Sequence, residues 1–466
     1  MPDAVPALFP EAADRGRISD WLTGRLEAAL QRVQAGPVAP TIDMQKFHAE
    51  LQSFDFSKPR PLEEALSWTI ERMQCGIVQM SNPRYFGPFN PGANFPAQCA
   101  DRIAGLFNPQ LASSASSPVP VALESHVIKA MARRADFGDE ATGHFATGGS
   151  EANYTALICA LTAANTRFSA DGARAFEGPP KFYTSRDCHI AWLKIAHQAG
   201  VGRSALRLVD TDGRGRMDPA ALLRAIAEDR AAGAVPVMVV ATAGTTGGGM
   251  IDPLQACTDI ARRHGLWLHI DAAWGGAALA SNRLRGALEG IGRADSMTID
   301  AHKWPATTMG CAMFIMRRGE LLSEAFHAST SFMPSSISAV DPYLNSVQWS
   351  RRFLGLRLFL ALAAAGWEGL GAHVDRGVEV VERVKEKLLA SGWRIANDSP
   401  LAVLAAIPPA ELGDVRTLVR RVVASGRAWV APTLFEGQDV VRICATNGET
   451  RMEDVDALVA ALNERP

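Results

Sequence analysis

Residues 267–276 read Trp-Leu-His-Ile-Asp-Ala-Ala-Trp-Gly-Gly, and this stretch decides the fold class. Its first half predicts a short buried strand that ends at Asp271. Burying a carboxylate at a strand end is unfavourable unless a cation or hydrogen-bond donors meet it. A loop cap and part of a ligand site are both open interpretations of Asp271.

A second stretch of the same kind follows at residues 298–304, Thr-Ile-Asp-Ala-His-Lys-Trp. Lysine is scarce, with eight in the chain, and Lys303 directly follows an apolar strand between His302 and Trp304. Alone, Lys303 would be a surface lysine packing beside an aromatic ring. Its place after a strand, like that of Asp271, makes it a candidate site residue.

Strand and helix signals alternate on both sides of these stretches. This alternation predicts an α/β fold with a mostly parallel central sheet covered by helices on both faces. The expected strands are residues 181–183, 235–241, 267–271, 297–300 and 311–316, and the expected helices are 151–164, 219–229 and 254–264.

Three zones of different composition predict three structural units. Residues 1–85 carry amphipathic helical spacing at 18–33 and 62–80, interrupted by prolines, and form an N-terminal helical segment. Residues 86–365 form the large domain, and residues 366–466 form a small α+β domain. In the small domain we expect helices at 374–389 and 452–463 and strands at 393–395, 402–406, 428–431 and 440–444.

Composition excludes several classes of protein. The chain has 466 residues, of which 47% are hydrophobic, and 47 basic against 49 acidic side chains give a net charge of −2. No basic tract supports nucleic-acid binding, and no apolar run is long enough for a membrane span. The seven scattered cysteines and the start of the chain, which resembles no signal peptide, favour a reduced, cytoplasmic protein without a disulfide framework or a metal site.

A third cluster, residues 147–153, reads Thr-Gly-Gly-Ser-Glu-Ala-Asn at the start of a predicted helix. Gly148 and Gly149 let the backbone approach an anion, Ser150 adds a hydroxyl, and the helix N-terminus favours negative charge. An ordinary N-cap explains the same residues. The chain has neither a P-loop nor G-x-G-x-x-G, G-x-S-x-G or H-E-x-x-H, which disfavours nucleotide binding, serine hydrolysis and zinc proteolysis.

Together the three clusters match the needs of pyridoxal 5'-phosphate. A lysine amine can form a Schiff base with its aldehyde, and an aspartate can keep its pyridine nitrogen protonated. A glycine-rich helix start can hold its phosphate. Lys303, Asp271 and residues 148–150 would supply these three functions.

Five motifs in this order resemble those of the group II pyridoxal-phosphate-dependent amino-acid decarboxylases, relatives of the aromatic amino-acid, glutamate and diaminobutyrate decarboxylases. They are residues 148–153, 187–189, 243–247, 269–276 and 300–304, and the resemblance extends over about residues 83–370. It implies the aspartate-aminotransferase-like fold (fold type I) and a homodimer interlocked through the N-terminal helices, with the active site near the subunit boundary.

The resemblance also implies roles for single residues. Lys303 would carry the cofactor, Asp271 would pair with the pyridine nitrogen, and His189 and Ala273 would lie on opposite faces of the ring. Thr246 and His302 would lie beside the cofactor, and Asp300 occupies a position where some relatives have asparagine near the phosphate. Catalysis is thus expected from Lys303, His189 and Asp271, and cofactor contacts from Gly148, Gly149, Ser150, His189, Thr246, Asp271, Ala273, Asp300, His302 and Lys303.

The expected reaction is decarboxylation of an L-amino acid to an amine and CO₂. We expect the substrate-pocket residues to include Phe89, Pro91, Gln110, Phe332 and Tyr343. In this family a loop tyrosine usually protonates Cα, whereas Phe332 stands at the aligned position and has no proton to donate. Tyr343 or His327 could replace it.

Without a donor, reaction of Cα with oxygen would give an aldehyde, ammonia and hydrogen peroxide. An aminotransferase, and a silent protein that keeps the fold, are the remaining alternatives.

Overall fold

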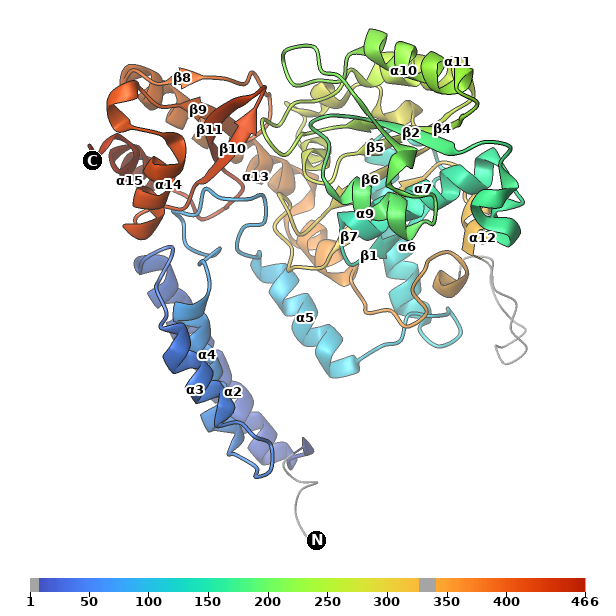
Figure 1. Cartoon of the computed structure of the whole chain (residues 1–466). Coiled ribbons are helices and arrows are strands. Elements are labelled where there is room, and N and C mark those ends of the chain that lie inside the picture. Colours follow the sequence, from blue (N-terminus) through green and yellow to red (C-terminus); the bar gives the residue numbers. More distant parts are fainter. Residues whose placement is uncertain (1–7, 327–340, 466) are drawn as a thin grey trace.

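The computed structural model describes residues 8–326 and 341–465. Within them a seven-stranded sheet forms the centre of the large body, in the strand order β1-β7-β6-β5-β4-β2-β3 (Figure 1). The strands are β1 (Thr142–Ala146), β2 (Pro180–Ser185), β3 (Leu206–Val209), β4 (Val235–Thr242), β5 (Trp267–Asp271), β6 (Ser296–Asp300) and β7 (Ala312–Met316).

The sheet is mostly parallel, which confirms the expected fold class. Strands β3, β2, β4, β5 and β6 pair in parallel, whereas β7 pairs antiparallel with both β6 and β1. Two strands, β1 and β3, were not predicted from the sequence. All five residues of β5, β6 and β7 are buried, because helices cover both faces of the sheet.

Helices pack on the two faces of this sheet over separate apolar clusters. Their ends follow ordinary capping chemistry: the Asp218 carboxylate accepts from the Ala220 N–H at the start of α10, and Gly265 ends α11 in the left-handed region. These helices are α6 (Pro118–Arg134), α7 (Gly149–Ala164), α8 (Phe168–Asp171), α9 (Ala191–Gln198), α10 (Pro219–Ala231), α11 (Leu254–His264) and α12 (Glu320–Phe326).

A smaller antiparallel sheet, in the order β10-β11-β9-β8, forms the C-terminal unit. The prediction of a strand at 428–431 was wrong in position, because the strand starts at Ala431 and ends at a two-residue turn of Glu436 and Gly437, both with positive φ. The elements of this unit are α13 (Leu356–Ala390), β8 (Arg394–Ile395), β9 (Val403–Ile407), α14 (Val415–Ala424), β10 (Ala431–Phe435), β11 (Gln438–Cys444) and α15 (Met452–Asn463).

Helix α13 joins the large body to the small unit. It crosses the expected domain boundary at residue 366, where Gly366 adopts a non-helical conformation with φ of 63° and kinks the helix. No helix in the described ranges is both long and apolar enough to cross a membrane.

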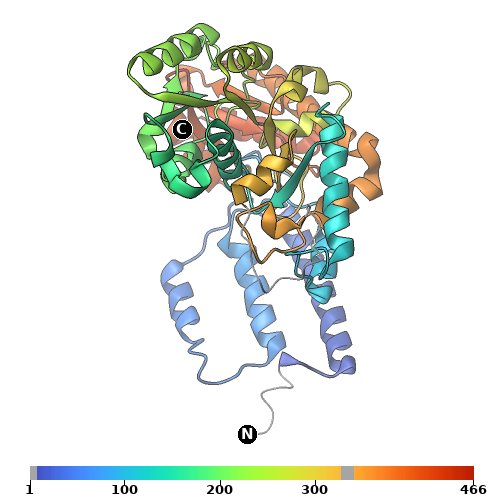
Figure 2. The same ribbon diagram turned by 90° about the vertical axis from the view of Figure 1, so that its right-hand side faces the viewer.

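The N-terminal helices α2 (Ala12–Ala35), α3 (Met44–Gln52) and α4 (Leu62–Gly76) form an arm that projects from the body (Figures 1 and 2). The arm is held at its base, where the Asn82 amide donates to the Val33 and Gly36 carbonyls and Asn447 donates to the Asn82 carbonyl. Helix α5 (Phe95–Phe107) follows and packs on α13.

Candidate active site

A cavity of about 370 Å³ lies at the carboxyl ends of the central parallel strands. Its wall includes side chains from strands β4, β5 and β6 and from the start of α7. Ligand sites of open α/β sheets usually lie at this end of the strands. The ten residues expected to contact the cofactor all line it: Gly148, Gly149, Ser150, His189, Thr246, Asp271, Ala273, Asp300, His302 and Lys303.

Asp271 places a buried carboxylate in the cavity wall. Its Oδ2 accepts from the Asn153 amide at 2.8 Å, and its Oδ1 accepts from the Ala273 backbone N–H at 3.2 Å. Within the described residues no lysine or arginine forms an ion pair with it. A buried carboxylate with neutral donors alone can still accept a hydrogen bond from a cationic group in the cavity.

Lys303 extends into the same cavity from the turn that follows β6. Its ammonium nitrogen lies 3.0 Å from Asp300 Oδ2, and His302 Nε2 lies 3.7 Å from the same oxygen. His302 is fixed through Nδ1, which contacts the Cys311 carbonyl at 2.9 Å. Asp300 Oδ1 is buried and has no hydrogen-bond partner in the described structure.

The N-terminus of α7 faces this lysine and carboxylate. A Cβ atom on Gly149 would lie 2.9 Å from Asp300 Oδ2, so glycine is needed for this close approach. Among the described residues no side chain caps the first turn at Gly148, which leaves backbone N–H groups available. Ser150 lies in this turn and is exposed.

His189 also lines the cavity. Its Nδ1 accepts from the Ala191 backbone N–H at 3.2 Å, which fixes the ring at the start of α9. Although the side chain remains partly exposed, desolvation by the cavity walls lowers the pKa of His189, and the neighbouring Asp271 opposes that shift. A neutral imidazole can pack flat against an aromatic ligand.

The loop that follows β4 contributes Gly244 and Thr246 to the cavity wall. Gly244 has φ of 105°, and the Trp274 indole donates to its carbonyl at 2.8 Å, where a Cβ would collide with that indole. The Thr246 carbonyl accepts from the Arg442 guanidinium at 2.9 Å. The loop therefore connects the cavity to the C-terminal unit.

The four expected substrate residues that the structure describes, Phe89, Pro91, Gln110 and Tyr343, do not line this cavity. Phe89 stacks on Trp274, a residue of the cavity wall, at a ring-centroid distance of 4.3 Å. Pro91, two residues further along the chain, is buried. Tyr343 is buried against Trp349. Phe332 and His327 lie outside the described residues.

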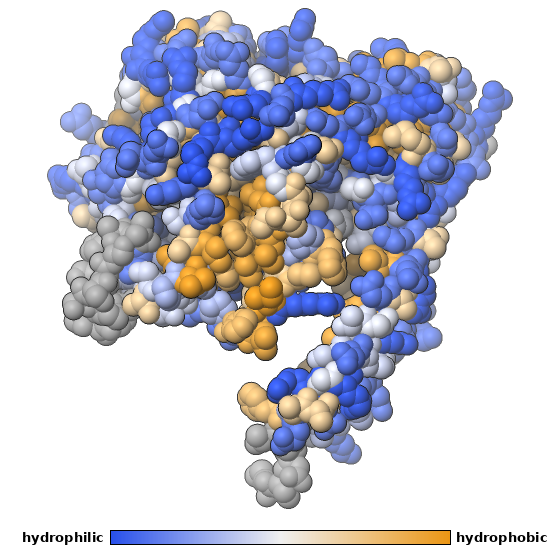
Figure 3. Space-filling view, turned by 180° about the vertical axis from the view of Figure 1, so that it is seen from behind, coloured by the Kyte–Doolittle hydropathy of each residue, from blue (hydrophilic) through white to orange (hydrophobic). Residues whose placement is uncertain are grey.

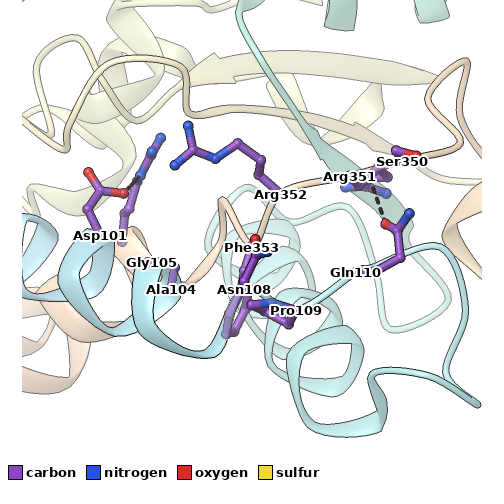
Figure 4. Close-up of a pocket in the computed structure, with 11 residues that line it drawn as sticks. Asp101, Ala104, Gly105, Asn108, Pro109, Gln110, Ser350, Arg351, Arg352 and Phe353 are labelled. Carbon is purple, nitrogen blue, oxygen red and sulfur yellow. Dashed lines mark hydrogen bonds and ion pairs between the residues drawn. The ribbon is translucent and has the colours of Figure 1, made fainter. Parts of the chain in front are cut away.

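Gln110 lies in a different cavity, of about 300 Å³, between α5 and the segment before α13 (Figure 4). Its side-chain oxygen accepts from the Arg351 backbone N–H at 3.0 Å. Arg352 and Phe353 line the same cavity. The structure therefore does not bring Gln110 to the cavity that contains Lys303, and its contact with substrate stays a prediction.

Three residues next to the site were assigned no function from the sequence. Asn153 contacts Asp271; it lies four residues after Gly149, and that spacing places both on one helix face. Gln348 donates to Glu151 at the start of α7, and Arg442 approaches from β11. No sequence signal joins these two to the cavity, because each is distant from it along the chain.

The donor set fits pyridoxal phosphate. The cavity combines an amine, a buried carboxylate that no described lysine or arginine pairs with, and a helix N-terminus whose glycine excludes any larger residue. An α/β protein with these three groups at the carboxyl ends of its strands has the layout of a pyridoxal-phosphate enzyme.

Comparison with known proteins gives the family. Residues 51–398 match the pyridoxal-dependent decarboxylase conserved domain, and the chain belongs to this family. Over 322 residues the chain is 34% identical to the acidic amino acid decarboxylase GADL1 of Bos taurus, and the match covers 66% of this chain and 61% of that relative. The chain thus spans about three fifths of the length of this curated relative.

Two further matches cover nearly the whole chain. An aromatic-L-amino-acid decarboxylase of Bacillus atrophaeus is 27% identical over 440 residues, covering 91% of this chain and 90% of the relative. The crystal structure of mouse CSAD superimposes with a TM-score of 0.91 at 26% identity, covering 97% of this chain and 98% of that one. The fold is thus that of pyridoxal-phosphate decarboxylases.

Proposed function

We propose that the protein is a pyridoxal-phosphate-dependent decarboxylase that converts an L-amino acid to the amine and CO₂. The observation that carries this proposal is the convergence of Lys303, Asp271 and the α7 N-terminus on one cavity. Membership of the decarboxylase family supports the choice of reaction.

The cavity residues would divide the binding of the cofactor among them. Lys303 would hold it covalently, Asp271 would bind the ring nitrogen, and Gly148, Gly149 and Ser150 would bind the phosphate. His189 and Ala273 would enclose the two faces of the ring, while Thr246 and His302 would contact its edge. Bound pyridoxal phosphate supplies an electron sink for the pair released when the bond from Cα to the carboxylate breaks.

Arg442 contacts the cavity wall at Thr246 without lining the cavity itself, and we propose it as a candidate for binding an anionic group of the substrate. Its side chain is buried and lies over the Phe89 ring at 5.3 Å, and its Nε has no hydrogen-bond partner in the described structure. A guanidinium with unused donors can bind a carboxylate. Every amino-acid substrate offers one.

The experiment that tests the proposal incubates the purified protein with a panel of L-amino acids and quantifies CO₂ and products by mass spectrometry. Because the names of the relatives include both acidic and aromatic substrates, the panel contains both kinds. One amine and one CO₂ per amino acid consumed supports the proposal. A keto acid without CO₂ would identify an aminotransferase instead.

The same assay separates amine from aldehyde formation. Phe332, which motivates the oxidative alternative, lies outside the described residues. An aldehyde with ammonia and hydrogen peroxide would support that alternative, and amine without peroxide would exclude it.

We further propose a cytoplasmic homodimer. Apolar side chains gather on the lower part of the body beside the arm (Figure 3), and on α5 the exposed ones include Ile103, Leu106 and Phe107. An exposed apolar area of this kind indicates an interface. A second copy would cover it. The seven free cysteines support a reducing compartment.

A further inference from the structure

Four buried side chains form one continuous hydrogen-bond chain that leads inward from Asp271, and the first of them, Asn153, also lines the cavity. The Trp267 indole nitrogen lies 2.8 Å from Ser296 Oγ, which lies 2.8 Å from His269 Nδ1. His269 Nε2 lies 3.0 Å from Asn153 Oδ1, and Asn153 Nδ2 lies 2.8 Å from Asp271 Oδ2. The chain thus links strands β5 and β6 to helix α7 and ends at the cavity.

The direction of every bond in this chain follows from its two ends. An indole N–H can only donate, and an ionised carboxylate can only accept. Asn153 donates to Asp271 through its nitrogen, so its oxygen accepts and His269 must carry its proton on Nε2. His269 Nδ1 then accepts from the Ser296 hydroxyl, whose oxygen accepts from Trp267.

The surroundings of His269 favour this single arrangement. Its ring is fully buried, between the edge of Trp192 at 5.9 Å and the face of Phe314 at 6.5 Å. Desolvation lowers the pKa of His269 to about 4, against the opposing effect of Asp271, so the ring is neutral at physiological pH. The remaining polar neighbour, Thr298 Oγ1, lies 3.4 Å from Nε2.

We propose that Asn153 and His269 are positioning residues, which orient Asp271 and stabilise its negative charge so that it can bind the ring nitrogen of the cofactor. The proposal rests on the proposed function. Each donor in a directed chain polarises the next, so the Asn153 N–H facing the carboxylate becomes a stronger donor. With Oδ2 held from behind, the carboxylate has a fixed orientation in the cavity wall.

A purely structural role of this hydrogen-bond chain predicts a different effect of mutation on ligand binding. Removing these hydrogen bonds would weaken the fold and affect any ligand in the cavity alike. Positioning of Asp271 instead requires that the effect depend on the ring nitrogen. A cofactor analogue with C–H in place of that nitrogen keeps the phosphate and the aldehyde, and therefore isolates this contact.

The test measures the affinity of the apoprotein for pyridoxal phosphate and for this carbocyclic analogue in the variant Asn153→Leu. Loss of a hydrogen bond to a charged group should weaken binding of pyridoxal phosphate by about 10-fold to 100-fold. Binding of the analogue should change by much less, because the change of cavity wall at Asn153 affects both ligands and the contact with the ring nitrogen affects only pyridoxal phosphate. The control is Thr155→Val, a buried polar residue two positions along α7 whose hydroxyl bonds only within the helix, and both affinities should keep their wild-type values.

A second pair of variants covers the case in which Asn153→Leu does not fold. His269→Gln can keep an amide donor near the position of Nε2 and should retain most of the preference for pyridoxal phosphate, whereas His269→Leu should lose it. Equal losses for the two ligands, or no loss in a folded variant, would overturn the proposal. Failure of the proposed function would be recognised separately, in the wild-type protein, by absence of cofactor binding or of CO₂ release.

Discussion

The ammonium nitrogen of Lys303 lies 3.0 Å from Asp300 Oδ2, and Asp300 is almost fully buried at 2% exposure. The pair closes one side of the cavity, with the carboxylate directly against the backbone of α7 at Gly149. The position at which the resemblance expects a phosphate neighbour thus carries a negative charge. This arrangement makes Asp300 the most informative residue of the cofactor site to change.

Replacing Asp300 with asparagine should strengthen cofactor binding. The substitution keeps the size of the side chain and removes one negative charge beside the site proposed for the phosphate. We expect the dissociation constant for pyridoxal phosphate to fall by about tenfold, which corresponds to about 1.4 kcal/mol. Titration of the apoprotein with the cofactor measures it, and weaker binding would show that the Asp300 carboxylate helps to hold the cofactor.

Gly149→Ala should have the opposite effect. The added methyl would lie 2.9–3.0 Å from both Asp300 oxygens, so either the first turn of α7 or the ion pair with Lys303 must move. We expect at least about tenfold weaker cofactor binding in a folded protein, since even small displacements of binding groups are costly. In the matched control, Gly286→Ala, the methyl meets no atom within 4 Å, and binding should be unchanged. Wild-type affinity in Gly149→Ala would contradict the assignment of the phosphate to this turn.

Asp252 predicts a pH dependence of stability. Burial raises the pKa of Asp252 from 3.8 to about 7, although the backbone N–H groups of Met217 and Thr242 oppose the shift. Between these two pH values the folded state binds a proton that the unfolded state has released. Stability contributed by this group is therefore greatest below pH 3.8 and is lost as the pH rises to 7.

The measurement is the free energy of unfolding of the wild type and Asp252→Asn across this range. The difference between the two should change by up to about 1.4 kcal/mol per pH unit. Parallel curves for the two proteins would show that folding does not raise the pKa of Asp252.

The proposed dimer predicts a phenotype for α5. Leu106→Glu combined with Phe107→Glu places two charges in a surface where the wild-type side chains are 78% and 75% exposed in the single chain. If a second copy covers them, the variant should be monomeric by sedimentation and should lose activity. The control Leu208→Glu places one charge at an exposed leucine of the edge strand β3 and should leave the dimer intact. A dimeric, active α5 variant would contradict this interface.

The sequence predicted the parallel sheet because its central strands are short apolar runs between amphipathic helices. It did not reveal β1, whose residues 142–146 include Gly143 and His144, because that strand depends on antiparallel pairing with distant β7. The edge strand β3, which pairs in parallel with β2, was missed because its four residues, Leu206–Val209, include Arg207 and only one buried side chain, and so give a weak strand signal. The strand expected at residues 428–431, which is β10 in the structure, was misplaced because the turn at Glu436 and Gly437 was not recognised.

The residues of the candidate site likewise divide into those that local sequence predicts and those that it does not. Lys303, Asp271 and the α7 start were predictable because each stands at the end of a strand or the beginning of a helix. Asn153 was within reach of helical spacing, whereas Arg442 reaches the site from another unit of the chain. Gln110 and Tyr343 do not line the cavity of their own chain. A structure of the proposed dimer would test whether they contact substrate in the cavity of a second copy.

The central claim is that Lys303 holds the cofactor. Borohydride reduction of the cofactor-loaded protein followed by peptide mass spectrometry tests it most directly. We expect a phosphopyridoxyl group on Lys303 in the wild type and none on any lysine of Lys303→Ala, which should remain folded but release no CO₂. A modified lysine elsewhere, or unchanged turnover in Lys303→Ala, would contradict it.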